Sequence, residues 1–416
     1  MERTDRLDVY YGTELVGTIH DTSPVTFEYA PTWLARAGRM TVAAIALQSG
    51  RNDSAAVQAF FENLLPEGEL RHYLAEQRKA STLFAMLLEV AGDTAGGFVI
   101  VPGGQAPQPA TYEATTWEAM AAVLGKKSAS TIDIQGADAR VSLAGAQDKT
   151  SIAIFEDGVP RLPKGTSPST HILKPNIGRL AKVWHSAANE TIVMLAAAKC
   201  GLPTAEVFYE PHTESCVVRR FDRLTRPDGT LARLIQYDLC QLAGTVSEKK
   251  YEKEGGPDLA KCAELIRRYS TQPAVDLRNF VAWIFFNLYA GNNDSHAKNL
   301  SLYNVPGKGV MLNFYDLMCT RMYPGLSQEF AFAIGGEFKP ASMTKAHLAA
   351  LAQQLGMRPQ FLVQQAADLA HRLPGALEQA VKEVKPTLPH SAKILADRLQ
   401  QFVLSTTKKT AVRLTS

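Results

Sequence analysis

The segment 292–299, NNDSHAKN, has the strongest chemical signal in the chain and directly follows an apolar stretch that ends at Ala290. Asp294 and Asn299 are five positions apart on a loop. This spacing lets a carboxylate orient a hydroxyl while a carboxamide oxygen holds a metal ion, as phosphoryl transfer requires. The alternative is a loop after a helix in which Asn and Asp only form turns.

A second carboxylate, Asp316 in LNFYDLM, comes after a predicted hairpin that starts at this loop and turns at Pro306-Gly307. The hairpin would let Asp316 converge with the loop from an adjacent strand end. Two acids suit a phosphoryl-transfer site, because Mg²⁺ takes few protein oxygens and neutralises phosphate charge. Without the loop, Asp316 would be an ordinary strand-end or N-cap residue.

Lys174 lies near the end of a β-rich run, in HILKP, and Glu190 follows sixteen residues later on a predicted helix. A strand lysine paired with a helix glutamate would hold its ammonium group against the phosphates of ATP. Unpaired, Lys174 would be a surface lysine, which is the more common case.

Two further segments could contact a nucleotide. The segment 142–150, SLAGAQDKT, has small side chains that let backbone N–H groups approach phosphates, although it matches neither common glycine-rich phosphate motif and could be a plain tight loop. The strand 216–223, CVVRRFDR, ends the β-rich region and could bind a base through its backbone. An edge strand with solvent-facing arginines explains it equally well.

The surrounding pattern predicts the elements that hold these residues. Leu7 to Ala30 is typical of an antiparallel meander, and 102–116 has the Pro and Gly content of an exposed connection between domains. A helix is predicted over 186–199 within a β-rich region. Apolar spacing then predicts helices over 258–269, 276–290, 342–355, 359–371 and 391–403, followed by a tail with little to bury.

Composition excludes several classes of protein. The chain has 416 residues, 46% of them hydrophobic, and its 44 basic against 41 acidic residues give +3, so it is globular and not a strongly basic nucleic-acid binder. Its apolar stretches fall short of the roughly 18 residues of a membrane span. Five cysteines without a C-x-x-C pair predict reduced thiols and a cytoplasmic protein.

In this order, SLAGAQDKT, THILKP, VVRRFDR, NNDSHAKNLSLY and FYDLM resemble the HipA family of bacterial toxin-antitoxin serine/threonine kinases, and FFENLLPEGELR is similar to the family's N-terminal motif. The resemblance implies an α+β, protein-kinase-like, two-lobed fold. It comprises an N-terminal subdomain (1–104), a β-rich N-lobe-like region (116–235), a helical C-lobe with the catalytic loop (236–405) and a frayed tail (406–416).

The same resemblance implies ATP and Mg²⁺ as cofactors and gives the residues their roles. Asp294 would be the catalytic base, with Asn299 and Asp316 holding Mg²⁺. Lys174, held by Glu190, would contact the phosphates. The other ATP-binding residues would be a phosphate loop (Ala144, Gly145, Ala146, Gln147, Asp148, Lys149), a hinge (Arg219, Arg220, Phe221), Asp222 near the ribose, and His296 and Tyr315 along the nucleotide.

Partners and regulation also follow from the resemblance. Autophosphorylation on Ser142 would repel the phosphates of ATP and switch the kinase off. The substrate would be a serine of an aminoacyl-tRNA synthetase, with glutamyl-tRNA synthetase favoured, and the blocked translation would cause growth arrest and persistence. A HipB-like helix-turn-helix antitoxin would be the partner, and operator DNA would be bound mainly through it.

Two rival functions remain at this point. One is a small-molecule or lipid kinase of related fold, against which the N-terminal motif argues. The other is a catalytically silent corepressor of an antitoxin, against which the intact Asp294, Asn299, Asp316 and Lys174 argue.

Overall fold

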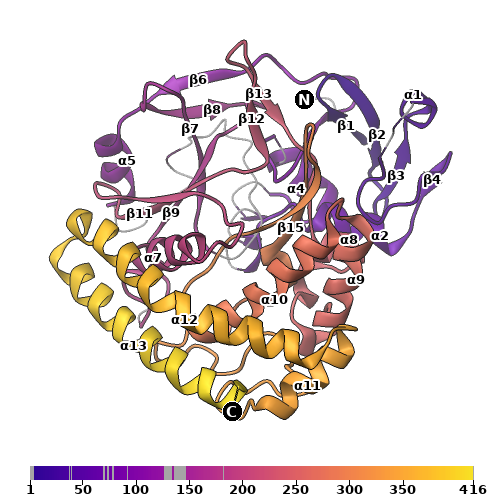
Figure 1. Cartoon of the computed structure of the whole chain (residues 1–416). Helices are drawn as coiled ribbons and strands as arrows, with labels where there is room; N and C mark the ends of the chain where they lie inside the picture. The colour runs from indigo at the N-terminus through magenta and orange to yellow at the C-terminus, as the bar shows by residue number, and fades with distance from the viewer. Residues whose placement is uncertain are drawn as a thin grey trace. The chain divides into compact units, whose positions relative to one another are not determined.

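The computed structural model describes residues 4–415 apart from 37, 39, 69–70, 73–74, 77–78, 91, 126–133, 135–146 and 181. The chain divides into two compact units. The first comprises Met1–Leu173 and Arg220–Glu248, and the second comprises Lys174–Arg219 and Lys249–Ser416. Both contain helices and strands, which confirms the predicted α+β class (Figure 1). The compact units therefore divide the chain at places other than 104 and 235.

The first unit contains an antiparallel sheet in the order β4-β3-β2-β1-β5. Alternating apolar side chains such as Leu7 and Val9 are fully buried, which is why the predicted meander folds against a core. Its strands are β1 (Arg6–Tyr11), β2 (Glu14–His20), β3 (Thr26–Tyr29), β4 (Arg51–Asn52) and β5 (Phe98–Pro102). The described helices of this unit are α1 (Pro31–Ala35), α2 (Ala55–Glu62), α4 (Leu83–Val90), α5 (Trp117–Leu124) and α8 (Leu239–Ala243).

The connection predicted over 102–116 is in part a strand. Thr111–Ala114 form β6, which pairs antiparallel with β8 (Pro160–Lys164), and β8 pairs with β7 (Thr150–Ile154). The backbone N–H of Thr111 also donates to Oγ of Ser167 at 2.8 Å. The segment is exposed as predicted, but this part of it is a strand whose backbone groups pair in a sheet. The other strands of the unit are β12 (Arg223–Thr225), β13 (Leu231–Arg233) and β14 (Gln236–Asp238), and β9 (His171–Pro175) continues into the second unit.

Helices dominate the second unit. Helix α12 packs on α7, α10, α11 and α13, and in Figure 1 α12 and α13 run beside each other. Its helices are α7 (Ser186–Lys199), α9 (Leu259–Tyr269), α10 (Pro273–Ala290), α11 (Lys345–Gln354), α12 (Pro359–Val384) and α13 (His390–Thr415). Its strands are β10 (Val207–Glu210), β11 (Ser215–Arg219), β15 (Leu300–Val305) and β16 (Gly309–Phe314), and short 3₁₀ turns span Glu252–Glu254, Ala297–Asn299 and Lys385–Thr387. A further turn, Ser247–Lys249, straddles the boundary between the units.

The C-terminal tail is ordered, so the prediction of a frayed segment over 406–416 is wrong as far as Thr415. Helix α13 continues to that residue. Val403, Thr407, Thr410 and Leu414 are buried and follow the helical spacing of one face. Two of these four residues are threonines, so the sequence shows no apolar spacing from which this part of the helix could be predicted.

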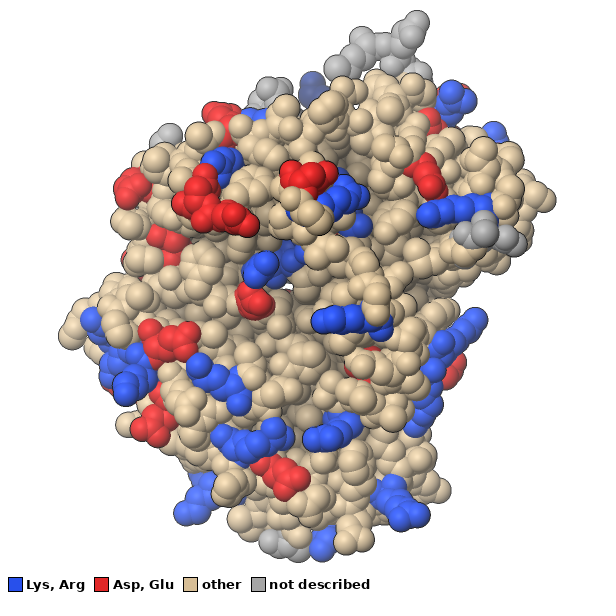
Figure 2. Space-filling view, turned by 45° about the horizontal axis from the view of Figure 1, so that its top comes forward, with Lys and Arg blue, Asp and Glu red and all other residues tan. Residues whose placement is uncertain are grey.

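The distribution of charged side chains agrees with the modest net charge of the chain. Lys and Arg side chains are interspersed with Asp and Glu on the face that Figure 2 shows. All five cysteines are buried and free. Within the described part of the chain, we find no helix whose length and apolar character would let it cross a bilayer.

Candidate functional site

An ion triad in the second unit, centred on the buried Lys174, joins three of the predicted site residues. Lys174, on β9, places its Nζ 2.5 Å from Oε1 of Glu190 and 2.5 Å from Oδ1 of Asp316. Glu190 lies on α7 and is 1% exposed, whereas the side chain of Asp316 is 40% exposed. The predicted pairing of Lys174 with Glu190 is present, and Asp316 completes it.

The triad keeps the lysine charged. Burial lowers the pKa of Lys174, but the carboxylates of Asp316 and Glu190 more than offset this effect, so its pKa lies well above the usual range. The ammonium of Lys174 therefore stays protonated between the buried carboxylate of Glu190 and the partly exposed carboxylate of Asp316.

Helix α7 is bonded directly to the segment that follows Asp316. Asn189, next to Glu190, donates from Nδ2 to the carbonyl of Cys319 at 3.0 Å and accepts the N–H of Cys319 at 2.9 Å. It also donates to the hydroxyl of Tyr323 at 3.0 Å. Asn189 is fully buried, so these bonds fix the helix carboxylate relative to the segment that carries Asp316.

The loop with Asp294 begins at a glycine that the structure requires. Gly291 ends α10 with a φ of +72°, and a Cβ at this position would lie 2.9 Å from Cε1 of Phe402 and 3.3 Å from Sγ of Cys319. Asn292 then donates from Nδ2 to Oδ1 of Asn287 at 2.7 Å. The loop is therefore held tightly at the point where it leaves the helix.

Asp294 is exposed while the residues on both sides of it are buried. Its N–H donates to Oδ1 of Asn292 at 3.2 Å, and Nδ2 of Asn299 donates to its carbonyl at 3.2 Å. One carboxylate oxygen, Oδ1, accepts the hydroxyl of Tyr251. The loop thus presents a single carboxylate to solvent from a rigid frame, as a base that must reach a substrate requires.

The hairpin of β15 and β16 brings the two predicted metal ligands to the same end. Leu300 pairs with Phe314, so Asn299 and Asp316 flank this pair, and the predicted turn at Pro306-Gly307 closes the other end. Asp276 of α10 accepts the N–H of Leu312 through Oδ2 at 3.1 Å, which fixes the hairpin to that helix.

Asp316 adopts a backbone conformation that is uncommon for a residue with a side chain, with a φ of +62°. Such strain is concentrated at functional sites. The preceding residue, Tyr315, donates its hydroxyl to the carbonyl of Lys298 and lies 3.1 Å from Oγ of Ser301. His296 is 6% exposed, and its ring meets the Tyr251 ring edge-on with centroids 5.2 Å apart.

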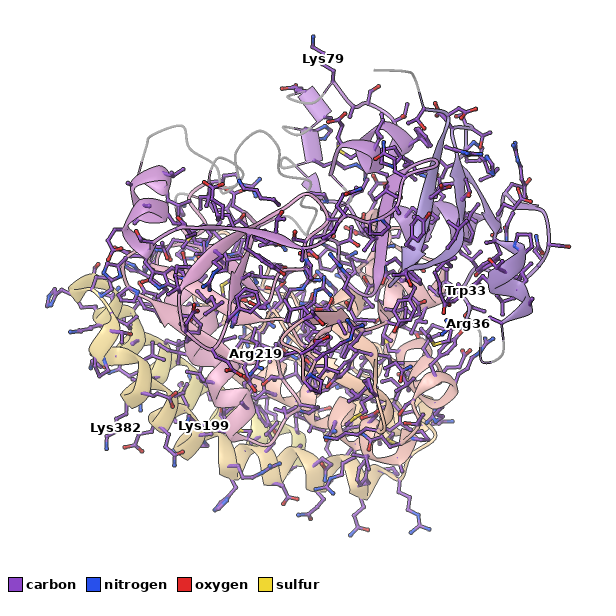
Figure 3. The ribbon with its side chains drawn as sticks, turned by 90° about the horizontal axis from the view of Figure 1, so that it is seen from above. Trp33, Arg36, Lys79, Lys199, Arg219 and Lys382 are labelled. Carbon is purple, nitrogen blue, oxygen red and sulfur yellow. The ribbon has the colours of Figure 1, made fainter. Side chains whose placement is uncertain are left out.

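The predicted hinge is divided between the two units. Arg219 belongs to the second unit, where its largely exposed side chain, labelled in Figure 3, pairs with Glu206 at 2.9 Å. Arg220, Phe221 and Asp222 belong to the first unit. The phosphate-loop residues Gln147, Asp148 and Lys149 are half-buried in that unit, whereas Ser142, Ala144, Gly145 and Ala146 lie outside the described residues.

Arg220 and Asp222 form a buried ion network that the sequence did not predict. Arg220 donates to both carboxylate oxygens of Asp222, at 3.0 and 2.8 Å, and to Oδ2 of Asp93 at 3.2 Å. Oδ2 of Asp222 also accepts the N–H of Gly96 at 2.7 Å, and Arg223 donates to both acids. The side chains of Arg220 and Asp222 are thus paired within the protein, and the predicted roles of the hinge for adenine and of Asp222 toward the ribose stay predictions. A backbone contact with the base stays a prediction.

Tyr251 was missed by the sequence analysis. It lies in KKYEKEGGP, where two consecutive glycines followed by proline indicate a constrained turn. Tyr251 and Asp294 are 43 residues apart in the chain, so no local sequence pattern predicts their contact.

The chain matches two family models, the HipA N-terminal domain over residues 7–101 and the HipA-like C-terminal domain over residues 141–380. It is 31% identical to Y4mE of Sinorhizobium fredii, whose name describes a candidate kinase, across 93% of this chain and 94% of that protein. It is 28% identical to the serine/threonine-protein kinase toxin HipA of Shewanella oneidensis, across 96% and 95% of the two chains.

A solved structure extends this likeness to three dimensions. In the complex of HipA, HipB and operator DNA from Shewanella oneidensis MR-1, a matching chain superposes with a TM-score of 0.82 at 26% identity, covering 97% of this chain and 96% of that chain. Family models, sequence relatives and fold agree with the resemblance carried by the motifs. The chain belongs to the HipA family of toxin-antitoxin kinases.

Proposed function

We propose that this chain is the toxin kinase of a HipBA-like toxin-antitoxin system and transfers the γ-phosphoryl group of ATP to a serine of a protein. The observation that carries the proposal is the triad of the buried Lys174 and Glu190 with the partly exposed Asp316, in the same compact unit as the exposed Asp294. Family membership supplies the reaction class, and the triad supplies an intact set of residues for it.

Each residue has a role that its surroundings support. Lys174 would contact the phosphates, with Glu190 holding its ammonium in place from α7. Asp294 would accept a hydrogen bond from the substrate hydroxyl and take its proton as the bond to phosphorus forms. His296 and Tyr315 would line the nucleotide, and the family resemblance alone assigns Gln147, Asp148 and Lys149 to the phosphate loop.

Mg²⁺ fits the donor set at the end of the hairpin. Asn299 and Asp316 offer a carboxamide and a partly exposed carboxylate, the hard oxygen ligands that Mg²⁺ binds. When bound, the ion would neutralise charge on the phosphates. Among the described residues no cluster of three or more His, Cys, Asp or Glu side chains forms a metal site, so the phosphates and water would complete the coordination.

The substrate and partners are proposed from the family. An aminoacyl-tRNA synthetase, glutamyl-tRNA synthetase above all, would be phosphorylated, and the blocked translation would arrest growth and favour persistence. A HipB-like antitoxin would bind the chain and bring it to operator DNA, as in the Shewanella complex of HipA, HipB and DNA. Autophosphorylation of Ser142 would inhibit the kinase by repelling the phosphates of ATP.

The experiment is a labelling reaction with γ-labelled ATP, the purified chain and a bacterial lysate, resolved into protein, lipid and small-molecule fractions. Label on a serine of a synthetase, identified by mass spectrometry and lost with Lys174→Met, is the expected result. Label confined to the lipid or small-molecule fraction would overturn the proposal. Label on a different protein would support protein kinase activity and would contradict the proposal that a synthetase is the substrate.

A further inference from the structure

The segment Lys249–Gly256, which precedes α9, places a tyrosine hydroxyl on the carboxylate proposed as the base. Tyr251 donates its hydroxyl to Oδ1 of Asp294. Asp294 belongs to the loop after α10, so the contact joins two segments of the second unit that are far apart in the chain. This hydrogen bond restricts the rotation of the Asp294 carboxylate about its side-chain bonds.

The ring of Tyr251 is itself held on two sides. The ring of His296 meets it edge-on at 82°, with centroids 5.2 Å apart. Nζ of Lys250 lies 5.5 Å from its centroid, within the range of a cation–π contact. His296 and Asp294 belong to the same loop, so one tyrosine side chain makes contact with both.

Two glycines fold the segment back under the tyrosine. The carbonyl of Tyr251 accepts the N–H groups of Glu254 and Gly256, each at 3.0 Å. Gly255 has a φ of +87°, and a Cβ at Gly256 would collide with the carbonyl oxygens of Lys249 and Tyr251. Only glycine fits these two positions, so the two consecutive glycines determine the geometry of the turn.

The segment is also tied to the part of the chain that follows Asp316. Oε2 of Glu252 accepts the N–H of Ala333 at 2.8 Å. Lys253 forms an ion pair with Glu329, and its Nζ lies 4.5 Å from the ring centroid of Phe338. The residues that directly follow Tyr251 are thus fixed to the second unit, and they hold the backbone that carries its hydroxyl.

From these contacts we infer that Tyr251 is a positioning residue for Asp294. The inference rests on the proposed function, in which Asp294 is the base. The tyrosine hydroxyl donates to Oδ1 and so restricts the orientation in which the carboxylate meets the substrate hydroxyl. Tyr251 touches neither substrate nor nucleotide in this role, and it acts through Asp294 alone.

The test is Tyr251→Phe, which removes one oxygen and keeps the ring contacts. The matched control is Tyr269→Phe at the end of α9, because among the described residues the Tyr269 hydroxyl has no hydrogen-bond partner. We expect kcat for transfer from γ-labelled ATP to myelin basic protein to fall about tenfold in Tyr251→Phe, the worth of a hydrogen bond to a charged group. The KM for ATP should not change, and the control should match the wild type.

A second measurement does not depend on activity. The melting temperatures of Tyr251→Phe, Asp294→Ala and the double variant should be non-additive, because the two side chains share one bond. Additive shifts, or a Tyr251→Phe kcat within twofold of an active wild type, would overturn the inference. A wild type that labels neither myelin basic protein nor a protein of the lysate would instead count against the proposed function, and the melting temperatures would still test the contact.

Discussion

Lys174 and Glu190 face each other between β9 and α7, with Nζ and Oε1 2.5 Å apart and both side chains almost fully buried. Removing one member of a buried pair leaves an uncompensated charge, which costs far more than breaking an exposed pair. The pair therefore contributes to the stability of the second unit as well as to the proposed site.

Glu190→Gln keeps the size of the side chain and removes its charge, leaving Lys174 paired with Asp316 alone. The free energy of unfolding should fall by roughly 2–3 kcal/mol in urea titrations. Glu383→Gln is the matched control, because Glu383 pairs with Lys199 at the protein surface at 2.8 Å. That variant should lose less than about 1 kcal/mol. Equal losses would contradict the importance of burial.

Asp93 makes the first unit sensitive to acid. Burial raises the pKa of Asp93, but Arg220, Arg223 and Arg233 more than offset it, and the net pKa lies well below the usual range. The resulting stability is complete above the unfolded carboxyl pKa of about 3.9 and is lost as pH falls through the folded value. Asp93→Asn should flatten the fall of melting temperature below about pH 4.

The control for this experiment is Asp397→Asn, which changes an exposed aspartate that pairs with Lys385 at 2.6 Å. It should keep the acid dependence of the wild type. If Asp93→Asn lost stability with the same slope as the wild type in this range, the buried network would not be the source of the acid sensitivity.

Gly291→Ala should disturb the loop that carries Asp294. It combines a left-handed φ of +72° with a close approach to Phe402 and Cys319, whereas Gly307 has a φ of +76° and nothing within 4 Å of an added Cβ. Both substitutions should cost about 1 kcal/mol of strain. Only Gly291→Ala should add an overpacking cost of about 1–3 kcal/mol, measured by urea unfolding. Identical losses would contradict the packing described at Gly291.

The end of α13 should contribute to stability. Leu414 is fully buried, so Leu414→Ala should reduce the free energy of unfolding by about 2–4 kcal/mol. Val412→Ala, two residues away and 56% exposed, should change it by less than about 0.5 kcal/mol. A Leu414→Ala variant as stable as the wild type would show that the tail is frayed in solution.

The elements that were predicted correctly are those marked by residues within the element itself. The helix over 186–199 and the hairpin turn at Pro306-Gly307 match the structure, because apolar spacing and turn residues are local properties. The pairing of Lys174 with Glu190 also followed from the motif order. The strand at 111–114 was missed because its pairing with β8 is not local.

Contacts between distant segments could not be predicted in the same way. Asp93 reaches Arg220 across 127 residues, and Tyr251 reaches Asp294 across 43. Arg220 and Asp222 in the motif VVRRFDR suggested a nucleotide contact. Only the fold showed that these two side chains pair with each other and that Arg220 also pairs with Asp93. Side-chain roles within a recognised motif thus depended on partners outside it.

The role of Asp294 is tested most directly by the rate of phosphoryl transfer from γ-labelled ATP in Asp294→Asn, with Glu254→Gln as a control for the loss of an exposed acid in the same unit. Asp294→Asn should lower the rate by at least about 100-fold and leave ATP affinity and melting temperature close to those of the wild type. Glu254→Gln should transfer at the wild-type rate. An Asp294→Asn variant as fast as the wild type would contradict the assignment of Asp294 as the base.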